Sequence, residues 1–156
     1  MLTQAELKEF FHYDPETGVF TRIKRVSGRC RVGDIVGSPD ELGYLRFRVN
    51  GKKYRAHRLA WLYVYGSFPE NEIDHINHDR SDNRISNLRQ ATRAENVWNS
   101  RKSGCSYDKQ HSNYRARICK NGRRIHLGRF DTLKQAQEAY AKAAKQYHGE
   151  FACAQD

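Results

Sequence analysis

The feature that constrains the fold most is the stretch of residues 72–100, EIDHINHDRSDNRISNLRQATRAENVWNS. It opens with an apolar, strand-like segment that ends in a carboxylate and an imidazole side by side, Asp74 and His75. A loop rich in Asn, Asp and Ser follows, and such residues favour turns. We expect the chain to return in a second short strand over residues 85–89, which carries Asn87. The pattern predicts two paired strands joined by a long polar loop.

A helix is predicted directly after these strands. Thr92 and Glu95 have the spacing of a capping box, which places Asn96 in the first turn of that helix. Where a strand ends, adjacent side chains can converge on one pocket, so Asp74 can offer a hard oxygen ligand for magnesium or manganese. His75, with an ordinary pKa near neutrality, is suited to take a proton from water. This layout is typical of a one-metal nuclease site.

The order strand, loop, strand and helix, with these residues in place, resembles the HNH (His-Me finger, ββα-metal) endonuclease motif in its phage homing-endonuclease branch. The resemblance implies that His75 is the general base, that Asp74 and Asn96 are metal ligands, and that Asn87 ties the loop down by hydrogen bonds. It also implies one divalent metal ion. Many members carry histidine where this chain has Asn96, which makes the site less suited to zinc than to Mg²⁺ or Mn²⁺. Asn99, one turn further, is a less favoured alternative ligand.

The residues before this motif predict an α+β arrangement with a small antiparallel sheet. A short amphipathic helix is expected over residues 2–11, with Thr3 and Glu6 as its capping box. A second, buried helix is expected over residues 56–65; its His57 is more often a packing or capping residue than a catalytic one. Short strands are expected over residues 19–22, 34–37, 43–49 and 52–56, the last two joined by an Asn-Gly hairpin. The basic face of residues 43–49 fits either phosphate contacts or an ordinary solvated strand.

The residues after position 100 predict a three-stranded antiparallel sheet packed on one helix. Residues 101–104 look like a short basic linker between a domain over residues 1–100 and one over residues 105–156. Two strands, 114–119 and 124–128, are joined by a second Asn-Gly hairpin, and their alternation separates a cationic face from an apolar one. The helix expected over residues 133–147 carries an apolar stripe that can cover the apolar face.

This second part resembles the ethylene-response-factor-type (Apetala-two) DNA-binding domain through RIHLG at 124–128, FDT at 130–132 and AYAKAA at 139–144. The resemblance implies major-groove recognition by the sheet. The candidate DNA-binding residues on the cationic face are Arg115, Arg117, Arg124 and His126. The first strand offers Ser106, Asp108 and Gln110 where the plant members carry arginines and a tryptophan, so a target sequence cannot be transferred from them. A basic face that contacts phosphates alone is the alternative.

Charge and composition agree with a double-stranded DNA partner. The chain has 28 Lys and Arg against 18 Asp and Glu, a net charge of +10 and a pI near 9.6. Residues 101–156 hold 12 of these cations against 5 carboxylates, and residues 1–100 hold 16 against 13, so most of the excess lies in the smaller part. Four cysteines without a CxxC pair favour free thiols in a reducing cytosol, and no signal peptide or membrane-spanning run is expected.

The sequence therefore predicts a metal-dependent DNA endonuclease of the homing type, acting as a monomer on DNA in the cytoplasm of a bacterium or phage-infected cell. It predicts neither a membrane partner nor a small-molecule substrate. Arg93, with Arg80 and Arg89, is a further candidate for contacts with phosphates. A catalytically inactive, sequence-specific DNA-binding regulator and an unspecific nucleic-acid-binding protein are the alternatives.

Overall fold

The computed structural model describes residues 1–26, 30–99 and 104–152. The chain divides into two compact units, Met1–Arg93 and Ala94–Asp156. The linker expected at residues 101–104 lies outside the described residues except for Gly104. The domain boundaries drawn from the sequence stay a prediction.

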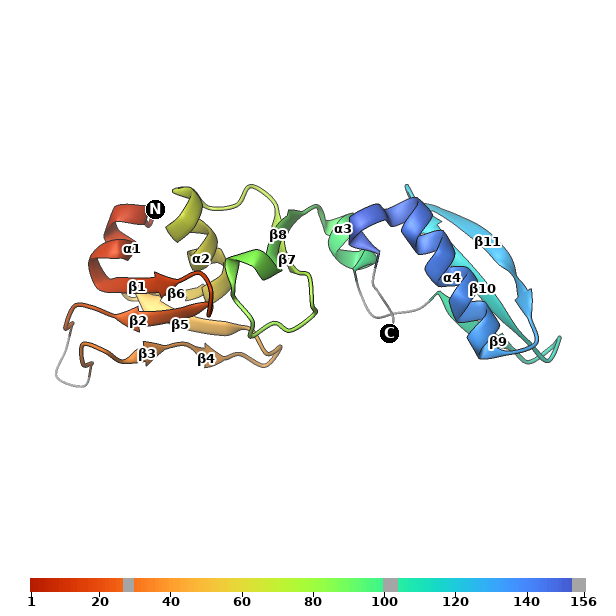
Figure 1. Cartoon of the computed structure of the whole chain (residues 1–156), viewed down its shortest axis with the longest axis horizontal. Helices are drawn as coiled ribbons and strands as arrows, with labels where there is room; N and C mark the ends of the chain where they lie inside the picture. Colours follow the sequence, from red (N-terminus) through yellow and green to blue (C-terminus); the bar gives the residue numbers. More distant parts are fainter. Residues whose placement is uncertain (27–29, 100–103, 153–156) are drawn as a thin grey trace. The chain divides into compact units, whose positions relative to one another are not determined.

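Unit 1 contains small antiparallel sheets and helices (Figure 1). Its elements are α1 (Gln4–Phe10), β1 (Phe11–Asp14), β2 (Val19–Arg22), β3 (Ile35–Val36), β4 (Ser38–Pro39), β5 (Leu45–Val49), β6 (Lys52–Arg55), α2 (Ala56–Tyr65), β7 (Glu72–His75), the 3-10 turn η1 (Ile85–Asn87) and β8 (Leu88–Ala91). The sheets have the orders β1-β2-β3, β4-β5-β6 and β7-β8. The helix α3 (Arg93–Trp98) begins at the last residue of this unit.

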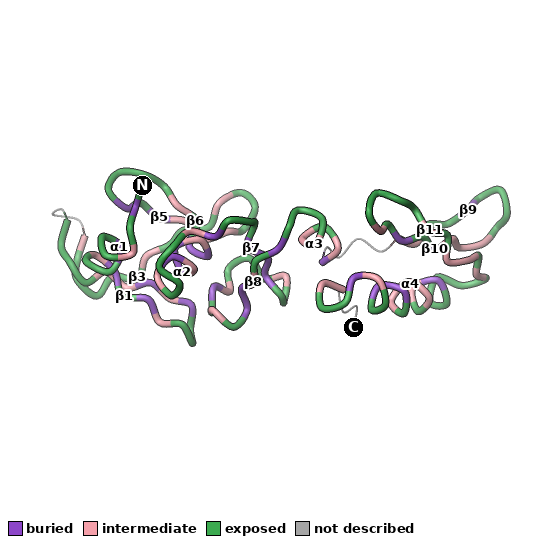
Figure 2. Tube along the Cα trace, turned by 90° about the horizontal axis from the view of Figure 1, so that it is seen from above, coloured by how far each residue is buried: buried purple, intermediate pink, exposed green. Residues whose placement is uncertain are grey.

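The core of unit 1 gathers under α2 and the first two sheets. Its largest fully buried apolar side chains are Leu7, Phe11, Tyr13, Phe20, Leu59 and Leu62. The alternation in β5 holds, because Phe47 and Val49 are buried while Arg48 is exposed. Figure 2 shows buried stretches in the strands and in α2, with exposed chain at the turns.

Local signals in the sequence account for several boundaries. Thr3 caps α1 and Glu6 completes the capping box. Asn50 and Gly51 have φ values of 48° and 77°, the left-handed conformation that a two-residue hairpin requires at both positions. The helix over residues 56–65 is confirmed in full and ends at Gly66, whose φ is 82°.

Two expectations about unit 1 are wrong in part, and two of its strands were not expected. The first helix ends at Phe10, since the next residues form β1 and pair with β2. Strands β1 and β4 were not expected from the sequence. Residues 85–89 are not one strand: η1 occupies Ile85–Asn87 and the strand runs over Leu88–Ala91. Asn87 therefore lies at the end of a tight helical turn, where its side chain faces the polar loop instead of following the alternation of a strand.

Unit 2 contains a three-stranded antiparallel sheet in the order β11-β10-β9 and a long helix. Its elements are β9 (Cys105–Asp108), β10 (Asn113–Lys120), β11 (Arg123–Phe130), α4 (Leu133–His148) and the 3-10 turn η2 (Gly149–Phe151). Thr132 and Gln135 form the capping box of α4. The apolar cluster between helix and sheet centres on Ile118, Ala143 and Ala144. Leu133, expected in the apolar stripe, is 43% exposed because it occupies the first turn of the helix.

The α+β class with small antiparallel sheets is confirmed, whereas the assignment of unit 2 to the ethylene-response-factor type stays a prediction. Within the described part of the chain, no helix has the length and apolar character needed to cross a membrane.

Candidate active site

Asp74 and His75 are the last two residues of β7, and both are buried, at 5% exposure each. The register of β7 with β8 places Asp74 opposite Arg89. The Nε of Arg89 donates to Oδ2 of Asp74 at 2.8 Å, and the Arg89 side chain is 15% exposed. Arg89 was expected to contact phosphates. In the structure it pairs with the buried carboxylate of Asp74, and removing Arg89 would leave that negative charge buried without its ion-pair partner.

His75 is surrounded by aromatic rings. The ring of His57, on α2, lies 5.0 Å from that of His75 and perpendicular to it. The ring of Tyr44 lies 5.7 Å from His75 and 5.2 Å from His57. Burial lowers the pKa of His75, although a hydrogen bond with Asn83 and the charge of Asp74 act in the opposite direction. His75 is accordingly neutral, and able to accept a proton, at neutral pH.

His57 is buried, at 4% exposure, as expected for a packing residue, but its position beside His75 was not predicted. Burial, followed by the proximity of His75, lowers the pKa of His57 to about 3. Two histidines that stay neutral thus share one wall of the site. No local pattern indicates their contact, because the two residues lie 18 positions apart in the chain.

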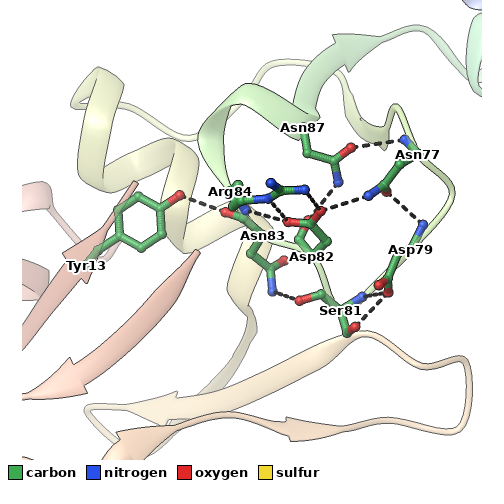
Figure 3. Close-up of polar contacts among 8 residues, drawn as sticks. All are labelled: Tyr13, Asn77, Asp79, Ser81, Asp82, Asn83, Arg84 and Asn87. Atoms are coloured by element: carbon green, nitrogen blue, oxygen red, sulfur yellow. Dashed lines mark hydrogen bonds and ion pairs between the residues drawn. The ribbon is translucent and has the colours of Figure 1, made fainter. Parts of the chain in front are cut away.

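Asn87 ties down the loop that follows His75 (Figure 3). Its Oδ1 accepts from the backbone N–H of Asn77 at 3.0 Å, and its Nδ2 donates to the carbonyl of Asp82 at 2.9 Å. The carbonyl of Asn87 accepts from the N–H of Ile76 at 3.0 Å. One side chain therefore joins the beginning and the end of the loop, the contact that the resemblance implies for this position.

Short-range polar contacts hold the rest of the loop (Figure 3). Asp82 accepts from Nε of Arg84 at 2.9 Å and from Nδ2 of Asn77 at 2.8 Å, and the Arg84 hydrogen bond contributes most to lowering the pKa of Asp82 to about 2. Asp79 accepts from both the N–H and the hydroxyl of Ser81. The loop is thus built from Asn, Asp and Ser side chains that replace regular backbone pairing.

The hairpin formed by β1, β2 and the turn between them supports the same loop from outside the motif. The hydroxyl of Tyr13, which is 1% exposed, donates to the carbonyl of Asn83 at 2.7 Å. The carbonyl of Pro15 accepts from the N–H of Ile85 at 3.1 Å. A Cβ on Gly18, whose φ is 73°, would lie 2.5 Å from the backbone N of Arg84. This close approach requires glycine at position 18.

Tyr44 and two arginines complete the wall around the histidines, and sequence reasoning missed Tyr44. The guanidinium of Arg55 lies 4.3 Å from the ring centre of Tyr44, and that of Arg80 lies 5.0 Å from it. Arg80 also donates to the carbonyl of Leu42 at 2.8 Å. The side chain of Arg80 therefore fastens the loop to the turn before β5, and both guanidinium groups stay at the surface.

The remaining candidates of the motif lie on α3. Asn96 is half-buried and belongs to unit 2 by its position in the chain, so its predicted meeting with Asp74 is a proposal. Asn99 is 3% exposed, and its N–H donates to the carbonyl of Glu95 at 3.0 Å. The Arg93 side chain is 90% exposed, with Nη1 3.9 Å from Oε1 of Glu72, as suits a contact with solvent or a polyanion.

The cationic face of unit 2 brings its four predicted residues onto neighbouring strands. Arg117 in β10 pairs with His126 in β11, and Cys119 pairs with Arg124. Arg115 pairs with Arg129, a cation that sequence reasoning did not single out. Arg129 and His126 are three positions apart, so in a regular strand they would point to opposite faces. The irregularity between Ala116 and Arg117 shifts the pairing with β11 by one residue and brings Arg129 onto the same face as Arg115 and His126.

Comparisons with known proteins point to the same segment of the chain. Residues 54–98 match the family model of the HNH endonucleases. The matched segment contains β7, the polar loop, β8 and the whole of α3, and with them the candidate residues Asp74, His75, Asn87 and Asn96.

An uncharacterized HNH endonuclease of Acanthamoeba polyphaga mimivirus is 36% identical over 107 residues, which cover 64% of this chain. The match spans 56% of the length of that viral relative. A solved structure of DNA binding and cleavage by the HNH homing endonuclease I-HmuI has a TM-score of 0.44 and 24% identity, covering 56% of this chain and 49% of that one. The family match and the viral relative support an HNH endonuclease domain in this chain.

Proposed function

We propose that the chain is a DNA endonuclease of the HNH homing type that hydrolyses a phosphodiester to a 3′-hydroxyl and a 5′-phosphate. It is proposed to act site-specifically and to nick one strand, since one catalytic motif per chain serves one strand at a time. The observation that carries the proposal is the buried His75 at the end of β7, next to Asp74 and held by the ring of His57.

His75 acts as the general base. Burial lowers its pKa, so the imidazole is neutral at neutral pH and accepts a proton from a water molecule. The resulting hydroxide attacks phosphorus in line, the bond to the 3′ oxygen breaks, and that oxygen takes a proton from solvent. The rings of His57 and Tyr44 restrict the orientation of the His75 ring during this transfer.

The donor set suits a hard divalent ion. The carboxylate of Asp74 and the amide oxygen of Asn96 are hard donors of the kind that Mg²⁺ and Mn²⁺ prefer. Among the described residues, no group of three or more His, Cys, Asp or Glu gathers as a zinc site would require. HNH nucleases generally use a divalent metal ion; Asp74 and Asn96 are the proposed ligands, and Mg²⁺ or Mn²⁺ the proposed ion. When bound, such an ion stabilises the negative charge that develops on the phosphate and the 3′ oxygen.

Asn87 is proposed to act indirectly. Its two side-chain hydrogen bonds close the loop that starts at the residue after His75, and the carbonyl of His75 accepts from the N–H of His78 at 3.0 Å within that loop. Asn87 therefore keeps the base in place without touching the substrate.

Double-stranded DNA is the proposed partner, bound by a monomer. Arg93 on α3 and the sheet residues Arg115, Arg117, Arg124 and His126 are the proposed contacts. The net charge of +10 supports a polyanion, and the excess in residues 101–156 supports a division between cutting by unit 1 and anchoring by unit 2.

The test is the conversion of supercoiled plasmid by the full chain in Mg²⁺, in Mn²⁺ and in EDTA, with wild type, His75→Ala and a matched control, His12→Ala. His12 is an exposed histidine of β1 in the same unit. The expected result is metal-dependent conversion to open circles by wild type and His12→Ala, and none by His75→Ala, which keeps its affinity for DNA.

Cutting by His75→Ala at the wild-type rate would refute the assignment of the base. Linear product in the first turnover would replace nicking with double-strand cleavage. Absence of cutting in every metal, with salt-sensitive DNA binding retained, would favour the inactive DNA-binding regulator.

A further inference from the structure

The exposed face of the sheet in unit 2 carries a single acidic residue. Of the residues in β9, β10 and β11, all described by the structure, only Asp108 is acidic. It lies at the end of β9, two positions after Ser106, which pairs with Arg115 of β10. Because side chains two apart share a face, Asp108 lies on the same face as the arginines.

Three cationic or protonatable side chains converge on the Oδ2 of Asp108. Nδ1 of His111 lies at 3.1 Å, Nε of Arg115 at 3.4 Å and Nη2 of Arg129 at 3.8 Å. Its Oδ1 accepts from the N–H of Gln110 at 3.1 Å. The two arginines are cross-strand partners, so the carboxylate draws together two side chains that the register already places side by side.

The carboxylate of Asp108 is less exposed to solvent than the two guanidinium side chains beside it. Asp108 is 7% exposed, whereas the side chains of Arg115 and Arg129 are 34% and 42% exposed. Burial raises the pKa of Asp108, but hydrogen bonds from His111 and Gln110 and the charge of Arg115 outweigh it and lower that pKa, so the carboxylate stays ionised at neutral pH. DNA approaching this face meets the guanidinium groups before it meets Asp108.

We propose that Asp108 is a positioning residue that holds Arg115 and Arg129 together as a pair for reading guanine in the major groove. The inference rests on the proposed binding of DNA by this sheet. An arginine reads guanine through two parallel hydrogen bonds to O6 and N7, which requires its guanidinium plane to be fixed. A buried carboxylate within ion-pair distance of one nitrogen of each guanidinium lowers the conformational freedom that binding would otherwise have to remove.

The arrangement predicts opposite effects on two measurable quantities. Asp108→Asn removes a negative charge from the face that meets phosphates, so affinity for unspecific DNA stays the same or rises. It also releases the two arginines, so discrimination between the selected site and its mutants falls by about tenfold, the lower part of the range for one bidentate contact. Simple damage to the sheet would weaken both kinds of binding together.

The experiment uses the full chain carrying His75→Ala, without added divalent ions, so that DNA is bound and not cut. A duplex pool with a randomised central segment is selected first with this protein. Fluorescence anisotropy then gives Kd for the selected duplex, for versions with each G·C pair replaced by A·T, and for a scrambled duplex. Variants are Asp108→Asn, Arg129→Lys, Arg115→Ala and, as a matched loss of one carboxylate, Glu138→Gln on the exposed side of α4.

The expected result is a selected site that contains guanine, about tenfold lower discrimination in Asp108→Asn and Arg129→Lys, and undiminished affinity of both for scrambled duplex. Glu138→Gln should discriminate as well as the parent. Arg129→Lys keeps charge and strand and so tests the arginine pair even if Asp108→Asn folds poorly.

Two results overturn the inference in distinguishable ways. The positioning role alone would be refuted if Arg115→Ala loses DNA binding while Asp108→Asn and Arg129→Lys still discriminate fully between the selected duplex and its mutants. Binding that is unaffected by Arg115→Ala would refute the sheet as the DNA-binding surface, and the inference with it.

Discussion

Replacing Asn87 by alanine tests whether the loop after His75 is held by one side chain. Asn87 is 7% exposed and makes two side-chain hydrogen bonds, one with the N–H of Asn77 and one with the carbonyl of Asp82. Each such bond contributes about 1 kcal/mol to the free energy of unfolding. The loss is larger when the backbone group that remains is buried and water cannot replace the missing hydrogen bond. Since Asn77 is exposed and Asp82 half-buried, both backbone groups can be rehydrated, and we expect a loss of about 1–3 kcal/mol.

The effect on cutting should be larger than the effect on stability suggests. The loop begins directly after His75, and a displacement of a catalytic group by about 1 Å can reduce a rate by about a hundredfold. Single-turnover cleavage of a plasmid, with enzyme in excess, should therefore slow by about that factor in Asn87→Ala, while Kd for the same DNA without divalent ions should be unchanged.

Two further variants define the comparison. Asn87→Asp keeps the acceptor for Asn77 but replaces the donor to Asp82, so its rate should fall between wild type and alanine. Asn71→Ala alters an exposed asparagine just before β7 and should cut normally. If Asn87→Ala cuts at the wild-type rate despite its lower stability, the loop contacts do not position the base and the proposed role of Asn87 is wrong.

The remaining predictions concern stability. Gly18→Ala should destabilise unit 1 by about 2–4 kcal/mol, since it combines a positive φ with a backbone clash. Gly51→Ala, at a similar φ with nothing within 4 Å of the new Cβ, should cost only about 1 kcal/mol in the same urea titration; equal losses would show that the close approach to Arg84 does not exist. The lowered pKa of His57 means that the unfolded chain takes up a proton below about pH 6.5 while the folded chain does not until about pH 3. The contribution of His57 to stability is therefore full above pH 6.5 and should fall by up to about 1.4 kcal/mol per pH unit below it. His57→Phe should reduce the slope of the profile between pH 6.5 and 5, and the slope that remains includes His75, whose pKa is also lowered; an unchanged slope would count against a buried neutral His57.

Predictions from local sequence patterns succeeded for elements whose structure depends on residues that are close together in the sequence. The capping box at Thr3 and Glu6, the Asn-Gly hairpins and the helix over residues 56–65 depend on neighbours in sequence, and the structure confirms them. The alternation of exposed and less exposed residues in β10 was also predictable, because successive side chains of a strand point to opposite faces of the sheet.

Contacts between distant segments escaped prediction. Nothing in the sequence connects Tyr44 or His57 with His75, because their meeting depends on how α2 and the turn before β5 pack around the end of β7. Similarly, the partnership of Arg129 with Arg115 depends on a bulge that shifts the register by one residue. Asp108 departs from the plant pattern in sequence, and its role became visible only through the arginines that converge on it.

The HNH motif of this chain is not self-contained. The segment that matches the family model begins at residue 54, yet the loop after His75 is held from outside it by the hydroxyl of Tyr13, the carbonyl of Pro15 and the backbone packing at Gly18. The hydroxyl contact is buried, so water cannot replace it at no cost. We therefore expect the contacts of Tyr13, Pro15 and Gly18 to help position the proposed general base, and replacing Tyr13 or Gly18 should slow cutting. The exposed His12 of the same hairpin makes none of these contacts and should be replaceable without loss.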